Sequence, residues 1–371
     1  MSFTSEEFAE RLARLRVAMS ACAVDAMLID DCEPLAYFTG YETTLNRYRA
    51  CIVPHTGEPV VVLRALDAEP FKTQSWFDGC ETFGDDEDAI EAVAAVLRTG
   101  GFASASIGYD PESHALTVGG YERLRRALPD ARFVAMPGVP WELRLVKSPS
   151  EIACIRRAAG AVDTAMREIA LAVRPGMSCR DIMAMAGRRL AQLGADAAHV
   201  GYAALARGAV FLHQWPSEQA LERGDVLHLE LVASYRGYEA RLMRCIALGT
   251  IDEERKSAAE QLVALQDRQL SAMKPGALAR DVDAILRDGV LAAGLREDYR
   301  NVTGYTLGYY SRAALRSSDF TRCFTPRADW RLEPGMVFHM YTSARGVSIS
   351  ETVLVTGEGA ERLTKLERRI L

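Results

Sequence analysis

The chain has 371 residues, of which 49% are hydrophobic and 25% charged, and its formal net charge is −6. A chain of this length exceeds one ordinary hydrophobic core and predicts two domains. The acidic balance argues against a nucleic-acid or anionic-membrane surface, because no run of Lys or Arg is present to neutralise phosphates. We therefore expect a small polar or zwitterionic substrate, with neither nucleic acid nor membrane as a partner.

The cysteine pattern and the first residues predict the cellular compartment. The eight cysteines are scattered without a CxxC pair, which is typical of reduced, buried thiols. The opening MSFTSEEFAERLARL lacks the basic and apolar regions of a signal peptide, and no apolar run approaches the length of a membrane span. These patterns predict a cytoplasmic protein.

The first part of the chain alternates between helical and strand patterns. Thr4 and Glu7 have the spacing of a capping box before an amphipathic segment that extends to about residue 20. Apolar runs of strand type follow at 23–31, 49–64 and 105–111. We expect a mixed α/β domain over residues 1–140, and no nucleotide cofactor, because neither GxGxxG nor a P-loop occurs.

The second part of the chain repeats itself. After a helix start at Ser148, the segments 174–195 and 274–295 share a basic-Pro-Gly entry, an Arg-Asp pair and a closing Gly. The strand-like GDVLHLE (224–230) is echoed by GMVFHMY (335–341). Two related halves of helix and antiparallel strand predict a duplicated domain over residues 148–371, with a pocket between the halves.

These features resemble those of the creatinase, prolidase and aminopeptidase P family. The motifs that carry the resemblance are WELRLVKSPSEIACIRRAA (141–159), LEPGMVFH (332–339) and SETVLVT (350–356). The resemblance implies an α/β (α+β) fold, in which an N-terminal mixed α/β domain precedes a C-terminal duplicated pita-bread domain. It also implies a homodimer.

The metal-ligand positions of that family are altered in this chain. Metal-dependent members bind two cations through two Asp, one His and two Glu, and the resemblance carries these positions onto Glu230, Arg241, Tyr305, Tyr341, and Ser350 or its neighbour Glu351. Hard divalent cations need several anionic oxygens, and a guanidinium repels them. We therefore expect no metal and no other cofactor.

The chain is most similar to the metal-independent creatinase and ectoine hydrolase-like members of the family. Those relatives hydrolyse non-peptide carbon–nitrogen bonds in small polar compounds. The resemblance therefore implies hydrolysis of an amide, amidine or cyclic amidine without a metal. The segment 309–326 departs from the pattern of that subgroup, so the substrate itself stays open.

Two residues are candidates for the proton transfers. His213 matches a family histidine near the scissile bond, and an imidazole can both take and return a proton near neutral pH. Glu230 lies in an alternating apolar strand, where a carboxylate is costly unless it is paired or functional. We interpret His213 as general base or acid and Glu230 as nucleophile or base. The alternatives are a structural histidine and a buried Glu230–Arg241 ion pair.

The remaining candidates would bind substrate. They are charged residues that suit a zwitterion, and phenol or imidazole groups that can donate hydrogen bonds to an oxyanion. These predicted substrate-binding residues are Arg64, Glu239, Arg241, Tyr305, His339, Tyr341 and Glu351. For each of them a structural or solvated role is the alternative.

Three other functions fit the same sequence. Altered ligand positions can serve different chemistry on the same scaffold, such as a lyase, cyclase or rearrangement step. The same substitutions also fit a catalytically inactive binding protein. The third alternative is a metal-dependent Xaa-Pro aminopeptidase.

Overall fold

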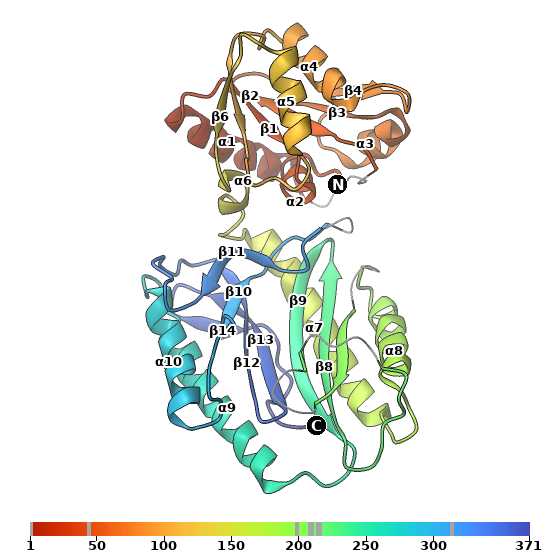
Figure 1. Cartoon of the computed structure of the whole chain (residues 1–371), viewed down its shortest axis with the longest axis vertical. Helices are drawn as coiled ribbons and strands as arrows, with labels where there is room; N and C mark the ends of the chain where they lie inside the picture. The colour runs from red at the N-terminus through yellow and green to blue at the C-terminus, as the bar shows by residue number, and fades with distance from the viewer. Residues whose placement is uncertain (1–2, 43–45, 197–199, 207–210, 213–216, 312–314) are drawn as a thin grey trace. The chain divides into compact units, whose positions relative to one another are not determined.

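The structure is a computed structural model that describes residues 3–42, 46–196, 200–206, 211–212, 217–311 and 315–371. It divides into two compact units (Figure 1). One unit comprises residues 1–144 and 309–317, and the other comprises 145–308 and 318–371. The segment 309–317 therefore belongs to the N-terminal unit, although it lies within the predicted range 148–371 of the second domain.

The N-terminal unit is built on a six-stranded mixed sheet in the order β4-β3-β2-β1-β5-β6. Its strands are β1 (Ala26–Ile29), β2 (Ala50–Pro54), β3 (Val60–Arg64), β4 (Cys80–Phe83), β5 (Ser106–Tyr109) and β6 (Arg132–Ala135). Its helices are α1 (Ser5–Ala21), α2 (Cys32–Thr39), η1 (Ala65–Asp67), α3 (Ala68–Gln74), α4 (Ala89–Thr99), α5 (Val118–Ala127) and α6 (Val139–Glu142).

Both faces of this sheet are buried, which explains the unbroken apolar run of β1. Met27 and Ile29 pack into the core that contains Leu12 and Leu15 of α1. Residues of the opposite parity, such as Leu28, pack into a second core with apolar residues of α4 and α5. The side chain of Thr4 accepts a hydrogen bond from the Glu7 backbone, as the predicted helix start requires.

The C-terminal unit contains a three-stranded sheet, β7-β8-β9, and a five-stranded sheet, β11-β10-β12-β13-β14. Its strands are β7 (Gly201–Leu205), β8 (Val226–Tyr235), β9 (Tyr238–Ala247), β10 (Gly304–Thr306), β11 (Asp319–Phe324), β12 (Val337–Ala344), β13 (Val347–Val355) and β14 (Ala360–Arg362). Its helices are α7 (Pro149–Ala172), α8 (Cys179–Gln192), α9 (Glu253–Ala272) and α10 (Ala279–Ala292). Ser148 and Glu151 form the complete capping box of α7.

The duplication predicted from the sequence is present in this unit. Each half has two helices followed by antiparallel strands, and each contains a long hairpin, β8–β9 or β12–β13. Both hairpins turn through an Arg-Gly pair, Arg236–Gly237 and Arg345–Gly346, and all four residues have positive φ. Two consecutive residues with positive φ are typical of the type I′ turn, whose twist suits a two-residue hairpin.

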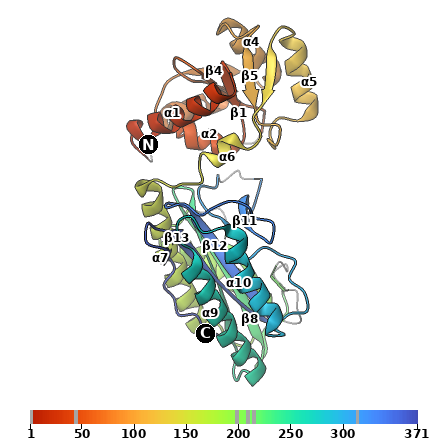
Figure 2. The ribbon, with the colours of Figure 1, turned by 90° about the vertical axis from the view of Figure 1, so that its left-hand side faces the viewer.

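The helices cover one face of the paired hairpins. α7 packs against β8 and β9, α9 packs against β12 and β13, and α9 and α10 run side by side (Figure 2). Phe338 and Met340 point to this side, where they share a core with Leu270 of α9. Because side chains alternate along a strand, His339 and Tyr341 point to the other face.

None of the helices in the described part of the chain combines the length and the apolar composition that a membrane crossing requires.

Candidate active site

The β8–β9 hairpin brings two carboxylates and one guanidinium to the same face. In its antiparallel register Glu230 lies opposite Met243, Val232 opposite Arg241, and Ser234 opposite Glu239. Residues directly opposite each other point to the same face. Glu230, Glu239 and Arg241 therefore share the face that points away from the helices, as the alternation in the sequence predicts.

Arg241 is the centre of the polar network on this face. Its Nε and Nη2 donate hydrogen bonds to Oε2 of Glu239 at 3.2 and 2.9 Å, and its Nη1 lies 3.9 Å from Oε1 of Glu230. Nη1 also donates to Tyr305 Oη at 2.9 Å and to Ser318 Oγ at 3.3 Å. All three charged residues are buried. Arg241 thus pairs directly with Glu239 and more distantly with Glu230.

The second half of the duplicated unit contributes two phenols and an imidazole. Tyr305 lies opposite His339 in the β10–β12 register, and Tyr341 lies opposite Ser350 in the β12–β13 hairpin. The Tyr305 hydroxyl is 2.9 Å from Nδ1 of His339, and the His339 and Tyr341 rings stack with their centroids 5.4 Å apart. Asn301 donates a hydrogen bond to Tyr341 Oη at 3.3 Å.

Burial changes the acidity of the carboxylates. The pKa of Glu230 is raised to about 7, chiefly by burial and partly by the nearby Glu239, while Arg241 opposes the shift. Burial also raises the pKa of Glu239, against the opposing effect of Arg241. A carboxyl group with a pKa near 7 can both accept and return a proton at neutral pH.

The same burial keeps the other groups neutral. It holds the pKa of His339 well below its ordinary value, helped by the positive charge of Arg241. It raises the pKa of Tyr305 to about 12 and that of Tyr341 above its ordinary value. At neutral pH His339 is a neutral imidazole and both phenols keep their protons, so the two tyrosines can serve as hydrogen-bond donors.

Glu351 lies on the opposite face of β13, away from this network. It pairs with Met340 in the hairpin, whereas Ser350 pairs with Tyr341. Of the two residues that the sequence left open for the last ligand position, the structure therefore places Ser350 on the polar face. Its Oγ accepts a hydrogen bond from the Met243 backbone.

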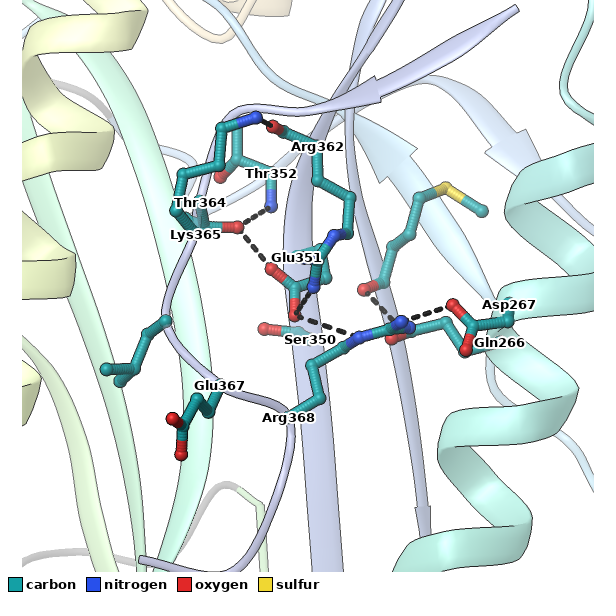
Figure 3. Close-up of polar contacts among 12 residues, drawn as sticks. Gln266, Asp267, Ser350, Glu351, Thr352, Arg362, Thr364, Lys365, Glu367 and Arg368 are labelled. Carbon is teal, nitrogen blue, oxygen red and sulfur yellow. Dashed lines mark hydrogen bonds and ion pairs between the residues drawn. The ribbon is translucent and has the colours of Figure 1, made fainter.

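Figure 3 shows the Glu351 carboxylate beside Thr364, Arg362 and Arg368, and Arg244 completes a buried ion pair with it. Its carboxylate accepts from Arg244 Nη2 at 2.8 Å and from the Thr364 hydroxyl, and Arg362 lies within 3.5 Å. Glu351 and Arg244 are both fully buried. We expected Glu351 to bind substrate together with the other candidates. The β12–β13 register does not agree with this expectation, because strand alternation turns the Glu351 side chain to the helix-covered face.

Two further predicted residues are not part of the network. Arg64 lies in the N-terminal unit, where its guanidinium forms a two-pronged ion pair with Asp85. His213 lies outside the described residues, so its role stays a prediction. His228, which corresponds to His339 in the repeated strand segments, forms a hydrogen bond through Nδ1 with Ser348 Oγ at 2.6 Å.

Sequence reasoning missed one member of the network. Ser318 accepts a hydrogen bond from Arg241, and it lies within the divergent segment 309–326 that the sequence left uninterpreted. No motif marks it, because its contact arises only when the chain returns to the sheet before β11. The partner of Glu351, Arg244, was also missed. Strand alternation could have placed it, because Arg244 lies three residues after Arg241 and therefore points to the opposite face.

The donor set does not fit a pair of divalent cations. In the described ranges, no group of three or more His, Cys, Asp or Glu side chains is placed to hold a metal ion. Arg241 instead donates hydrogen bonds to Glu239 and Tyr305, and its Nη1 lies 3.9 Å from Oε1 of Glu230. A guanidinium in that place supplies the positive charge that buried carboxylates require.

The fold and the polar face define a protein with a creatinase-type N-terminal unit and a pita-bread C-terminal unit. The sequence matches the metallopeptidase family M24 over residues 153–357 and the creatinase/prolidase N-terminal domain over residues 11–146. The chain therefore belongs to family M24 and is a hydrolase of that family.

Known proteins with different activities resemble the chain over its whole length. The ectoine hydrolase of Halomonas elongata is 26% identical, covering 100% of this chain and 98% of that protein. The probable dipeptidase PepE of Mycobacterium tuberculosis is 27% identical, with 96% and 94% covered. The prolidase structure from Pyrococcus horikoshii superposes with a TM-score of 0.83 at 23% identity, covering 98% of this chain and 100% of that one. This last likeness supports the fold alone.

Proposed function

We propose that the protein is a metal-independent hydrolase of a non-peptide carbon–nitrogen bond in a small polar substrate. The observation that carries the proposal is the position of the Arg241 guanidinium. It lies among Glu230, Glu239 and Tyr305, at a place that the family resemblance assigns to a metal ligand. A fixed positive charge there leaves acid–base side chains to carry out the reaction.

Glu230 acts as the base in the proposed reaction. Its carboxylate takes a proton from water while the water oxygen bonds to the carbon of the amide or amidine. The tetrahedral intermediate then collapses, the carbon–nitrogen bond breaks, and the Glu230 carboxyl returns the proton to the leaving nitrogen. His213 remains the predicted second proton carrier.

The phenols and the guanidinium hold the charges that develop. Tyr305 and Tyr341 donate hydrogen bonds to the oxyanion of the intermediate, in a buried setting where such bonds stabilise a transition state more than in water. Arg241 orients Tyr305 through its 2.9 Å hydrogen bond. Glu239, itself bonded to Arg241, offers a carboxylate to a cationic substrate group.

A cyclic amidine zwitterion is the favoured substrate class. It carries one positive and one negative group, which match the mixed charges of the network. The similarity to ectoine hydrolase supports this class, and ectoine is the first compound to test. An Xaa-Pro dipeptide is the second candidate, because the relatives include an Xaa-Pro dipeptidase.

The test combines chelation with product analysis. Protein dialysed against EDTA is assayed with ectoine, related amidines and Xaa-Pro dipeptides in 18O-labelled water, and its metal content is measured. We expect turnover of a non-peptide substrate with label in the product and no loss on chelation. Glu230→Gln should lower this turnover by about 10²–10⁴-fold, whereas Glu222→Gln, at an exposed position, should leave it unchanged.

Two outcomes would contradict the proposal. Activity on dipeptides that disappears on chelation and returns with a divalent cation would show a metallopeptidase. Turnover without incorporated label would show a lyase or cyclase step.

A further inference from the structure

The N-terminal unit contains a cavity of about 310 Å³ whose lining includes Cys32, Glu33 and Arg49. This volume lies at the lower end of the range for small-molecule pockets, about 300–1,000 Å³. All lining residues belong to the N-terminal unit. The cavity therefore shares no residue with the Arg241 network of the C-terminal unit.

Arg49 brings a buried positive charge to this cavity. Its side chain is 5% exposed, its Nη2 donates to Cys32 Sγ at 2.8 Å, and its Nε has no hydrogen-bond partner among the described residues. Burial raises the pKa of the Cys32 thiol to about 11, so this partner is neutral at physiological pH. The acidic neighbour of Arg49 is Asp30, whose pKa is raised to about 7, so its carboxyl group is only partly ionised at neutral pH. A buried guanidinium that is incompletely balanced is costly, and an anionic ligand would lower that cost.

Glu33 brings to the same cavity a buried carboxyl oxygen that has no hydrogen-bond donor within the described ranges. It is 4% exposed, and its buried Oε1 accepts no hydrogen bond from any residue that the structure describes. It follows Cys32 in the first turn of α2, and burial raises the pKa of its carboxyl group against the opposing charges of Arg144 and Arg316. A ligand with a cationic N–H donor would satisfy this oxygen and stabilise the carboxylate form.

Two other arginines of the lining, Arg316 and Arg123, already have acidic partners. Arg316 stacks over Trp141, with its guanidinium carbon 4.1 Å from the ring centroid, and lies 3.6 Å from Asp31. Arg123 forms an ion pair with Asp88. Among the lining residues that the structure describes, the buried side-chain polar atoms without a hydrogen-bond partner are Nε of Arg49 and Oε1 of Glu33.

We propose that this cavity binds a small amino-acid-type zwitterion. The ligand's carboxylate accepts hydrogen bonds from Arg49, and its ammonium group donates to Glu33. Arg316 and Trp141 form the wall beside it. This site does not depend on the function proposed for the C-terminal unit.

Calorimetric titration of the full chain tests the site. The probes are the twenty free L-amino acids, together with matched primary amines and carboxylic acids that each lack one of the two charges. We expect one or more amino acids to bind, and their single-charge analogues to bind at least tenfold more weakly. Glu33→Gln and Arg49→Gln should each weaken amino-acid binding by roughly 10- to 100-fold, because each removes a charge-assisted hydrogen bond.

Matched variants distinguish this site from binding elsewhere on the chain. Arg123→Gln alters a lining arginine that is already paired, and it should leave the dissociation constant within about twofold. Tyr305→Phe alters the network of the other unit and should have no effect on this binding. Circular dichroism confirms that each variant is folded, and Glu33→Gln tests the site if Arg49→Gln does not fold. Absence of binding by every amino acid, or equal weakening by Tyr305→Phe, would overturn the proposal.

Discussion

The hydroxyl of Tyr305 accepts a hydrogen bond from Nη1 of Arg241 at 2.9 Å, which links the two halves of the duplicated unit. Arg241 comes from β9 of the first half and Tyr305 from β10 of the second. Both are buried, so neither group is solvated by bulk water. The Tyr305 hydroxyl therefore has two hydrogen-bond partners, the Arg241 guanidinium and Nδ1 of His339.

Removing the hydroxyl should therefore affect catalysis more than stability. We expect Tyr305→Phe to lower kcat by about 10²–10³-fold, as the loss of one oxyanion donor does. The loss in the free energy of unfolding should be about 1–2 kcal/mol, from one unsatisfied donor on Arg241. Steady-state kinetics and urea unfolding measure the two effects.

Tyr299→Phe is the matched control for that variant. Tyr299 is also a buried phenol, but its hydroxyl bonds to Thr342, whose side chain has the opposite parity to Tyr341. It should lose stability without a comparable loss of kcat. Equal kinetic losses in the two variants would remove Tyr305 from the proposed role.

The raised pKa of Glu230 predicts a pH dependence of activity. A carboxylate that acts as base is active when deprotonated, so kcat/KM should rise with pH through an apparent pKa of about 7. Glu230→Gln should lower kcat/KM by about 10²–10⁴-fold and abolish this limb. A pH–rate profile of both proteins checks the assignment, and an unchanged limb in the variant would assign it to another group, such as His213.

Arg241 should stabilise the fold because it balances two buried carboxylates. We expect Arg241→Met to lower the free energy of unfolding by about 3–5 kcal/mol, the typical effect of leaving buried charge without a partner. Adding Glu239→Gln should restore part of that loss, because the double variant buries one charge fewer. Urea unfolding of the two single variants and the double variant measures the coupling, and strict additivity would contradict it.

Glu351 should behave in the opposite way to Glu230. Its ion pair with Arg244 is fully buried on the helix-covered face, so Glu351→Gln should cost about 3–5 kcal/mol of stability. The kcat/KM per folded molecule should stay near the wild-type value at low temperature. A variant that is as stable as wild type but binds substrate poorly would restore the substrate-binding role predicted from the sequence.

Asp30 predicts a pH dependence of stability in the N-terminal unit. Burial raises its pKa to about 7, despite hydrogen bonds from Ser113 and Tyr48. The folded state then binds this proton more tightly than the unfolded state, so stability falls as the pH rises from about 4 to 7.

Asp30→Asn should remove that fall. Relative to the variant, the wild type should lose at most about 3 kcal/mol between pH 5 and pH 7 through this group. Urea unfolding at several pH values measures the difference. Parallel stability curves for the two proteins would show that Asp30 does not titrate in this range.

Much of the architecture followed from local sequence patterns. The apolar runs at 23–31, 49–64 and 105–111 contain strands β1, β2, β3 and β5, and the Pro-Gly repeats precede helices α8 and α10. Alternation also placed Glu230, Glu239 and Arg241 on one face. These features depend on neighbours in the chain, and their periods can be read directly.

Pairing between distant strands decided the rest. The sequence left the last ligand position open between Ser350 and Glu351 and predicted Glu351 as the substrate-binding residue. The β12–β13 register turned Ser350 to the polar face and Glu351 to the helices. Ser318 reached Arg241, and residues 309–317 joined the N-terminal unit, through contacts between segments far apart in the chain. A shift of one residue in register exchanges the two faces of a strand, so only the tertiary structure could assign these side chains.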